Sequence, residues 1–490
     1  MPLEGGSFRE GFVGQPISLN PASSDNPVDQ EASVLLYNTL GNLMAGHDVS
    51  QDGLTYNIQL HQDLKWSDGS PLTSDDVVYT VKTIQDPATN SPLAQEFAGV
   101  TAQRVSQIQV RFTLTTPYAF FLRDLKRLLV IPQHIWGAIP PENFRLSDYN
   151  LEPVGSGPYK FQSFTKTKDG FITDYHLTVN PNYYGPRPYI PDFYLDFYKN
   201  ISDVAQALAR HDIQGYGTLL PLSDTANLRG VTDSLLDLPN YYAVFFDQAA
   251  NPALADKGLR TALAEAVNVP AITAQVPGAL DVTGPWLGSA NASGTLTETY
   301  DPNAASSSIA AWKSKNKGAP IDITLTVPNV GFLMNAAKEI AADWQAVGVD
   351  SVQIQPFDPQ DPTDRTIASR SYEALLFGNV FENANDLFPF WDSSQAAYPG
   401  SNLALYQNPK VDALLEAARA TTSTSTQISD LTLAQNDIVS DAPAVFLFSL
   451  PYHYYHTSNL GGFAAGPIST PGDRFLGMSG WYVEKVKVLN

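Results

Sequence analysis

The most informative pattern in this chain lies in residues 372–391, where an apolar run turns polar within a few positions. The run Ala374–Phe377 is typical of a strand buried on both faces. Gly378 follows, and a glycine inside a strand pattern usually marks a bulge or the close approach of another backbone. The order predicts either a core strand that delivers a ligand-facing edge or a buried strand that runs into a surface loop. The polar residues beyond the glycine include Asn379, Glu382 and Asp386.

Alternating and helical spacings predict the other elements. Thr73, followed three residues later by Asp76, predicts a capping box at the start of a helix. Residues 321–327 alternate, 332–347 have helical spacing and end at Gly348, and 349–354 return to strand. This is a βαβ unit, which implies parallel pairing. We also expect strands over 8–13, 54–60, around Ile213, 444–450 and 481–488, helices over 31–43, from Ser202, after Asn408 and over 428–439, and a polar connection over 420–427.

Length and composition narrow the class of protein. A chain of 490 residues is too long for one hydrophobic core, so two or three domains are expected. A net charge of -21 argues against nucleic acid as a partner. There are no cysteines, which excludes disulfides, thiolate metal sites and cysteine nucleophiles. No apolar run approaches ~18 residues and the first residues lack the features of a signal peptide, so we expect a cytoplasmic protein or a processed mature form.

Catalytic constellations were sought and not found in the sequence. It has no Gly-x-Ser-x-Gly elbow, no His-Glu-x-x-His and no phosphate-binding loop. Residues 155–157, Gly-Ser-Gly, predict a turn, with His176 as only a remote base for Ser156. His453 and His456 could bind a metal from a turn or helix, whereas in a strand they would face opposite sides. Tyrosine-rich packing is the simpler interpretation, so neither a metal nor another cofactor is expected.

A series of motifs carries a family resemblance. The order DGLTY (52–56), KWSDG (65–69), PLT (71–73) and DDVVYT (75–80) resembles the extracellular solute-binding proteins of the oligopeptide, dipeptide and nickel family, which serve ABC transporters. Each piece alone is weak, but the combination is specific. Further similar segments follow in the family's order and cover nearly the whole chain: IPQHIW at 131–136, VGSGPYKF at 154–161, LTVNPNYYG at 177–185 and the segment 244–267.

The resemblance implies an α/β fold of the bilobed, periplasmic-binding-protein-like type (class II) with an extra α+β subdomain. Lobe I would comprise 1–31, 155–243 and 456–490, lobe II, the extra subdomain, 32–154, and lobe III 244–455. The implied function is to capture short peptides in an interlobe cleft and deliver them to an ABC transporter permease. The protein would be extracytoplasmic, either periplasmic or lipid-anchored, and a monomer.

The resemblance also implies site residues. The family's peptide pairs its backbone with a strand that maps here to Leu376, Gly378 and Val380, and an acid holds its ammonium group. That acid maps to Glu382, where the family usually has Asp, and Asp386 is the alternative. At the position after the glycine, where the family usually has an aromatic residue, this chain has Asn379. The opposite side of the ligand would meet the extended segment from Gln15 to Ser18. A second departure is the segment 41–51, which is shorter than in the family by about a hairpin, so the resemblance does not define the edge of lobe II at this point.

Other functions stay open on the sequence alone. Relatives share the fold and not the ligand, so a receptor for a nickel chelate or an oligosaccharide is an alternative. The alternative from another class is a hydrolase that uses two carboxylates across a cleft.

Overall fold

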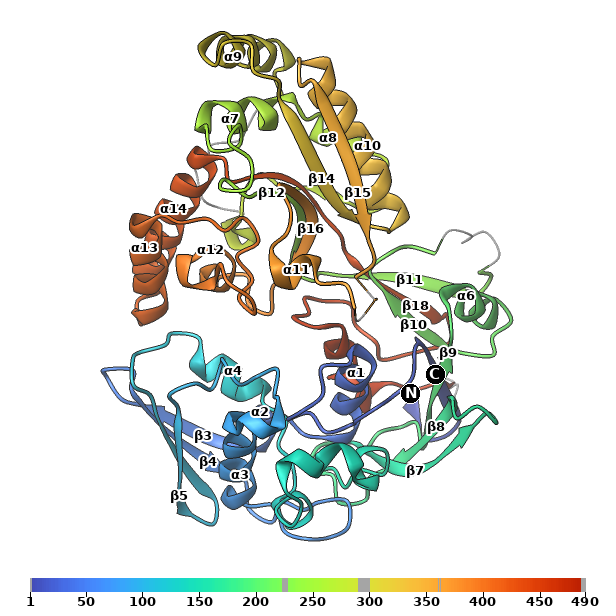
Figure 1. Ribbon diagram of the computed structural model, residues 1–490. Helices are drawn as coiled ribbons and strands as arrows, with labels where there is room; N and C mark the ends of the chain where they lie inside the picture. Colours follow the sequence, from blue (N-terminus) through green and yellow to red (C-terminus); the bar gives the residue numbers. More distant parts are fainter. Residues whose placement is uncertain (1, 223–227, 290–299, 360, 362, 486–490) are drawn as a thin grey trace, which may run out of the picture. The chain divides into compact units, whose positions relative to one another are not determined.

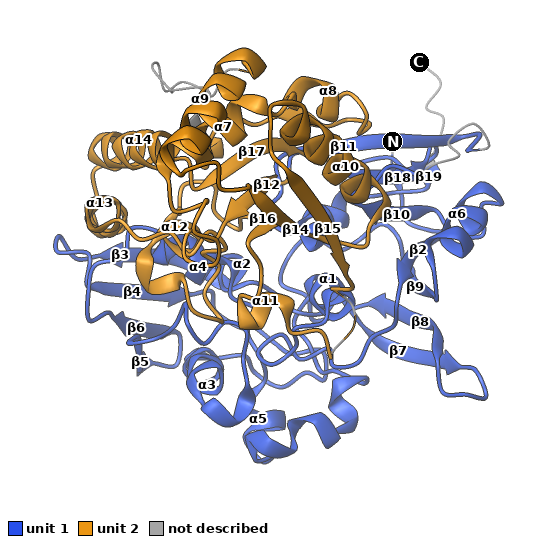
Figure 2. Ribbon diagram, turned by 45° about the horizontal axis from the view of Figure 1, so that its top comes forward, with its two compact units in different colours: residues 1–237, 452–490 blue, residues 238–451 orange. Residues whose placement is uncertain are grey.

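The computed structural model describes residues 2–222, 228–289, 300–359, 361 and 363–485. The chain forms two compact units, residues 1–237 with 452–490 (unit 1) and residues 238–451 (unit 2), which are coloured separately in Figure 2. The chain therefore passes from one unit to the other twice. The sequence predicts lobe boundaries at 243/244 and 455/456. The passages between the two compact units lie at 237/238 and 451/452. The strand that follows each passage pairs only within its own unit. The division of unit 1 into lobes I and II stays a prediction.

Unit 1 contains a seven-stranded sheet of mixed direction, in the order β11-β18-β10-β2-β9-β8-β7 (Figure 1). Helix α6 (Ile201–Ala209) buries Val204, Ala207 and Leu208 against it. The strand expected around Ile213 begins two residues later, because Ile213 itself packs into this core ahead of β10. The strands are β2 (Ser7–Val13), β7 (Tyr159–Lys166), β8 (Ile172–Val179), β9 (Asp192–Tyr198), β10 (Gly215–Thr218), β11 (Val231–Leu236) and β18 (Tyr452–Thr457).

The end of unit 1 pairs with its beginning. Of the strand predicted over 481–488, the structure forms β19 (Glu484–Lys485), which pairs antiparallel with β1 (Pro2–Leu3). Residues 486–488 lie outside the described residues.

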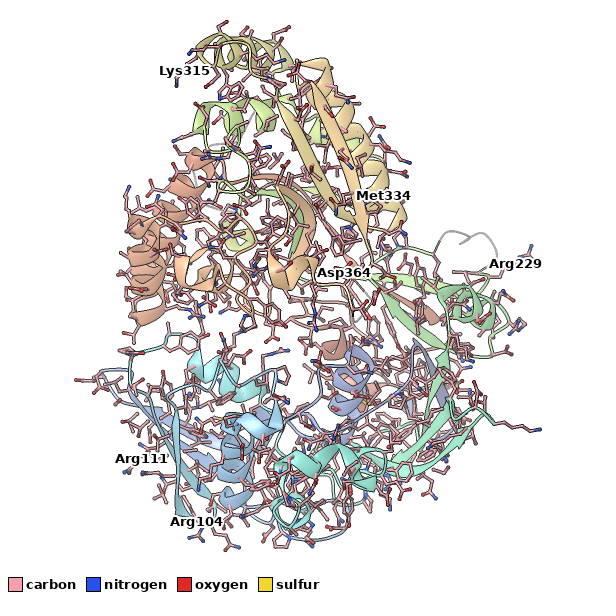
Figure 3. The ribbon with its side chains drawn as sticks, viewed as in Figure 1. Arg104, Arg111, Arg229, Lys315, Met334 and Asp364 are labelled. Carbon is pink, nitrogen blue, oxygen red and sulfur yellow. The ribbon has the colours of Figure 1, made fainter. Side chains whose placement is uncertain are left out.

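A second sheet in unit 1 has four antiparallel strands, ordered β3-β4-β6-β5. The capping box at Thr73 and Asp76 is confirmed at the start of helix α3 (Ser74–Gln85). The segment 41–51 contains strand β3, which lies at one edge of this sheet. Arg104 binds Asp75 of α3 at 3.1 Å, and Arg104 and Arg111 are labelled on this sheet in Figure 3. The strands are β3 (Met44–Val49), β4 (Thr55–Leu60), β5 (Thr101–Ser106) and β6 (Gln109–Thr113).

The helix predicted over 31–43 is wrong in its extent. The chain forms α1 (Pro27–Leu36) and α2 (Leu40–Leu43) with an extended break between them. The Gly-Ser-Gly turn causes the break: Gly157 N donates to Leu36 O at 2.8 Å, and Asn38 N donates to Ser156 Oγ at 3.1 Å. A Cβ on Gly157 would lie 2.6 Å from the carbonyl carbon of Leu36, so glycine is required there. The turn is thus a packing element.

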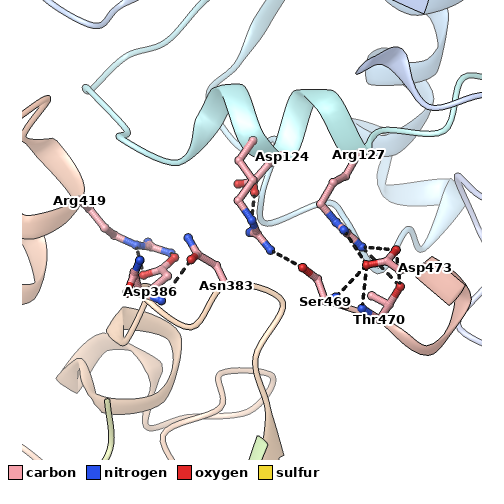
Figure 4. Close-up of polar contacts among 10 residues, drawn as sticks. Asp124, Arg127, Asn383, Asp386, Arg419, Ser469, Thr470 and Asp473 are labelled. Atoms are coloured by element: carbon pink, nitrogen blue, oxygen red, sulfur yellow. Dashed lines mark hydrogen bonds and ion pairs between the residues drawn. The ribbon is translucent and has the colours of Figure 1, made fainter. Parts of the chain in front are cut away.

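The helices α4 (Phe121–Arg127) and α5 (Gln133–Trp136) complete the regular α-structure of unit 1 among the described residues. Arg127 of α4 binds the carboxylate of Asp473 at 2.9 and 3.1 Å, which ties α4 to the segment 469–473 of the same unit (Figure 4).

Unit 2 is built on a six-stranded sheet in the order β13-β17-β12-β16-β14-β15. The predicted βαβ unit is confirmed: β14 and β15 are parallel and are joined by α10 (Gly331–Ala346). Gly348 has a φ of 111°, as expected of a glycine that ends a helix. The strands are β12 (Asn240–Phe246), β13 (Leu280–Asp281), β14 (Asp322–Pro328), β15 (Ser351–Phe357), β16 (Ala374–Val380) and β17 (Ala444–Ser449).

Helices cover this sheet, and α13 and α14 contribute to a core cluster that includes Trp391 and Phe446. Asn408 caps α13 as the sequence predicts. The polar connection expected over 420–427 is shorter than predicted, because Ser423 accepts from Thr426 N and begins α14. The helices are α7 (Lys257–Ala266), α8 (Val269–Thr273), α9 (Pro302–Lys315), α11 (Thr366–Ser369), α12 (Phe388–Trp391), α13 (Pro409–Ala420) and α14 (Thr424–Asp441).

Candidate functional site: the open edge of strand β16

Strand β16 is paired unequally on its two sides. It pairs with β12 along its whole length, without a shift of register. On the other side, its pairing with β14 covers only Ala374 and Leu375. Among the described residues, no strand pairs with that side of β16 from Leu376 to Val380. We call this stretch the open edge of β16.

The register decides which backbone groups point to the open edge. Asp247 N donates to Glu373 O at 2.9 Å and Phe381 N donates to Pro239 O at 2.8 Å. These bonds lie on the β12 side, and hydrogen-bonding direction alternates along a strand. The backbone N–H and C=O groups of the odd-numbered residues of β16 therefore point to β12. The carbonyl of Leu376 and both backbone groups of Gly378 and Val380 point to the open edge, so the residues expected to pair with a ligand lie together.

A bulge is one of the two features that a glycine in this strand pattern indicates, and Gly378 does not form one. β16 continues through it to Val380 with unbroken pairing to β12. Tyr242 lies directly opposite on β12, and its ring covers the glycine: a Cβ on Gly378 would lie 2.6 Å from Tyr242 Cε1. An aromatic side chain, and no second backbone, therefore makes glycine necessary here.

The cluster around Tyr242 is aromatic. Its ring centroid lies 5.3 Å from those of Phe332, at the start of α10, and Phe448, on β17. Burial raises the pKa of Tyr242 to about 12, so the hydroxyl stays protonated at neutral pH. Asn379, on the opposite face, is 5% exposed, and its Nδ2 has no hydrogen bond of good geometry among the described residues. Asn379 thus packs inward, and its role in ligand binding stays a prediction.

Glu382 lies just beyond the end of β16 and is exposed. The residues that the structure describes form no hydrogen bond or ion pair with its carboxylate. Its carboxylate is therefore available to a cation at the end of the open edge. Its role as the anchor for an ammonium group stays a prediction.

Asp386 is already engaged. Its carboxylate receives two hydrogen bonds from Arg419 of α13, at 2.9 and 2.6 Å (Figure 4). The guanidinium of Arg419 also lies 4.1 Å from the centroid of Phe388. Asp386 is 7% exposed, so the pair fixes the loop after β16 to α13. Releasing Asp386 for a ligand would leave Arg419 without this partner, which favours Glu382 over Asp386 as an anchor.

Gln15 and Ser18 lie in unit 1, and both are partly buried. Gln15 Oε1 accepts from Ile172 N at 2.8 Å. The buried carboxylate of Asp29 accepts from the N–H groups of Ile17 and Ser18, each at 2.8 Å, and burial raises the pKa of Asp29. The segment is thus held in shape by its own N–H groups. The role of Gln15 and Ser18 in ligand binding stays a prediction.

The other candidates have structural partners. His453 and His456 lie in strand β18, so they face opposite sides; His453 Nδ1 contacts Asp233 at 2.9 Å and His456 Nε2 contacts Ser234 Oγ at 3.0 Å. His176 contacts Asp192 at 2.8 Å. Among the described residues, no group of three or more His, Asp or Glu side chains could hold a metal ion. No helix formed by the described residues is long and apolar enough to cross a membrane.

Sequence reasoning missed Tyr242, Phe332 and Arg419. Tyr242 lies in the apolar and aromatic run NYYAVFF, which predicts a strand but not its neighbour. Phe332 is the first aromatic of a predicted helix, and nothing local brings it to β12. Arg419 is 33 residues from Asp386, beyond the reach of any local pattern. The missing information in each case is which elements are adjacent.

The fold and the open strand edge define a class, the solute-binding proteins. Residues 39–437 match the bacterial extracellular solute-binding proteins, family 5 Middle. The match spans well over half of the chain, so the chain belongs to this family, and the family resemblance is confirmed. The bilobed, type II periplasmic-binding-protein-like α/β fold is confirmed by the same relationship and by close structural matches.

Three relatives illustrate the similarity. The chain is 27% identical to Protein XP55 of Streptomyces lividans, over 83% of this chain and 75% of that protein. It is 23% identical to the oligopeptide-binding protein AppA of Bacillus subtilis, over 95% of this chain and 90% of AppA. The crystal structure of the ABC transporter substrate-binding protein CtaP of Listeria monocytogenes has 25% identity and a TM-score of 0.84, and the match covers 98% of this chain and 100% of CtaP.

Proposed function

We propose that this protein is a receptor that binds short peptides in an extended conformation along the open edge of β16 and delivers them to an ABC transporter permease. The observation that carries the proposal is the row of backbone groups at Leu376, Gly378 and Val380 with which no strand of the described part of the chain pairs, with a carboxylate at its end. The oligopeptide-binding name of AppA and the substrate-binding name of CtaP support it.

The chemistry is strand addition. Main-chain hydrogen bonds between a peptide and a strand edge do not depend on the peptide's side chains, so one site accepts many sequences. Gly378 presents no side chain of its own to obstruct the ligand's backbone. Glu382 follows the strand and would accept charge-assisted hydrogen bonds from the peptide's ammonium group. A sugar would leave most of these backbone groups unmatched in register.

We further propose that the protein acts as a monomer and without catalysis, outside the cytoplasm, either free in the periplasm or lipid-anchored. The family consists of extracellular solute-binding proteins. Glu382 and Asp386 are disfavoured as the two carboxylates of a hydrolase, because Asp386 is engaged with Arg419.

Calorimetry tests the proposal. We expect a mixed pool of peptides of two to eight residues to bind, and free amino acids to bind poorly, because affinity by strand addition grows with the number of paired main-chain groups. Nickel–histidine and an oligosaccharide are titrated in parallel. No heat from any peptide pool, together with clear binding of one of these solutes, would end the peptide hypothesis. Slow turnover of the peptides would instead favour the hydrolase.

A further inference from the structure

We propose that the open edge of β16 includes a subsite for one aromatic or branched apolar side chain of the ligand, formed by Tyr242, Phe332 and Val380. The inference rests on the proposed function and names the class of peptide that the site prefers. Ligands would be peptides with such a residue at the position that lies beside Gly378, and not peptides of any sequence equally.

The three side chains lie on one face of the sheet. Side chains alternate along a strand, so Gly378 and Val380 share a face, and Tyr242 is the cross-strand neighbour of Gly378 on that face. Val380 is 45% exposed. Phe332, from the first turn of α10, packs edge-on against Tyr242 at 5.3 Å and is half-buried. Apolar surface is therefore available next to the unpaired backbone groups.

An added strand would place a side chain on this surface. The pleat of a sheet continues from strand to strand, so every second residue of a bound peptide faces the same side as Gly378. Neighbouring side chains on adjacent strands lie about 4.5–5.5 Å apart at Cβ. Because Gly378 has no side chain, the ligand's residue beside it meets the ring of Tyr242 and the edge of Phe332. Aromatic pairs of this kind favour an aromatic or branched partner.

The chemistry of the subsite excludes charge. Its walls are two aromatic rings and a valine, backed by Phe448, which is fully buried. A charged side chain placed there would lose hydration, and these walls offer it no opposite charge. Phe332 also borders a hollow of about 70 Å³ between α8 and α10, lined by Ile272, Gln275, Val276, Phe332, Asn335 and Ala336. This free space lets Phe332 adjust to ligand side chains of different size.

The test is a positional scan by calorimetry. The host peptide is Ala-Ala-Ala, and each position is replaced in turn by Phe, Leu or Glu. We expect at least one position at which Phe or Leu binds about ten- to a hundredfold more tightly than Ala, as burial of an apolar side chain implies. Glu at the same position should weaken binding.

Two variants locate the effect. Phe332→Ala is expected to reduce the gain from Phe or Leu to less than about threefold. Val380→Thr, which keeps the shape of an exposed strand residue, should reduce the gain in the same direction and guards against a folding defect in the first variant. Leu433→Ala, at a 49% exposed position of α14, is the control and should keep the full preference.

The outcomes separate this inference from the proposed function. If peptides bind equally well whatever residue they carry, or if the preference survives in both Phe332→Ala and Val380→Thr, the subsite is refuted and the peptide receptor stands. If no peptide binds the parent protein at all, both fail. A preference for Phe or Leu that is lost in the two variants and kept in Leu433→Ala supports the subsite.

Discussion

Replacing Glu382 by Gln tests the proposed anchor most directly. The substitution keeps the shape of the side chain and removes its charge. We expect peptides with a free amino terminus to bind much more weakly to the variant, whereas N-acetylated peptides should lose little. The reason is that acetylation removes the ammonium charge before the mutation removes its partner.

The expected magnitude depends on how much water the ligand excludes. A carboxylate and an ammonium group about 3 Å apart interact by about 1 kcal/mol in water and about 5 kcal/mol at an effective dielectric constant of about 20. Glu382 is exposed in this structure, which favours the lower part of that range, while a peptide on the adjacent strand edge excludes water from one side. We therefore expect about 2 kcal/mol of coupling, or about thirtyfold in Kd.

The assay is a double-mutant cycle by calorimetry, with two forms of one tripeptide and two forms of the protein. Asp386→Asn is the matched control, since it removes the neighbouring charge. This variant should lower the melting temperature, because Arg419 keeps its charge and loses its carboxylate partner. It should show no coupling to the amino terminus. Equal losses for free and acetylated peptides in Glu382→Gln would refute the anchor, and coupling in Asp386→Asn would move the role to that residue.

Two further predictions concern the scaffold. Gly378→Ala should destabilise the protein by about 1–3 kcal/mol and weaken peptide binding, because its Cβ would lie 2.6 Å from Tyr242. The control is Gly331→Ala, where a Cβ meets nothing within 4 Å. Equal melting temperatures of the two variants would contradict the clash at Gly378. Burial raises the pKa of Glu10 from 4.5 to about 7, so the folded chain keeps a proton that the unfolded chain releases. Its contribution to the free energy of unfolding is full below about pH 4.5 and is lost as the pH rises to about 7, by at most about 1.4 kcal/mol per pH unit. Glu10→Gln should flatten this part of the stability profile measured by urea unfolding, and an unchanged slope would show that Glu10 is ionised throughout.

Local patterns in the sequence predicted the elements whose formation depends on neighbours in the chain. The capping box at Thr73, the alternating strand over 54–60 and the βαβ unit over 321–354 are all found in the structure. Their signals, hydrogen bonds three residues apart and side chains with a period of two or about 3.6, are complete within a few residues. The resemblance of ordered motifs added the family and the bilobed fold.

Elements that depend on distant partners were predicted less well. The helix expected over 31–43 is broken because the turn at 155–157 packs against it, and no pattern within 31–43 records that turn. For the same reason, the sequence indicated a bulge or the close approach of another backbone at Gly378, whereas the ring of Tyr242 lies over it. A glycine signals close approach but not what approaches.

The features of the candidate site also fall into those that the sequence determined and those that the tertiary structure decided. The sequence alone determined that an apolar strand ends in polar residues, and the resemblance mapped Leu376, Gly378, Val380 and Glu382 onto a ligand-binding role that stays a prediction. Only the tertiary structure decided that β14 stops pairing after Leu375 and that Arg419 engages Asp386. The physical reason is that strand pairing and ion pairing join residues that are distant in the chain. A strand's own sequence is compatible with a paired or an open edge, and its neighbours in space decide between them.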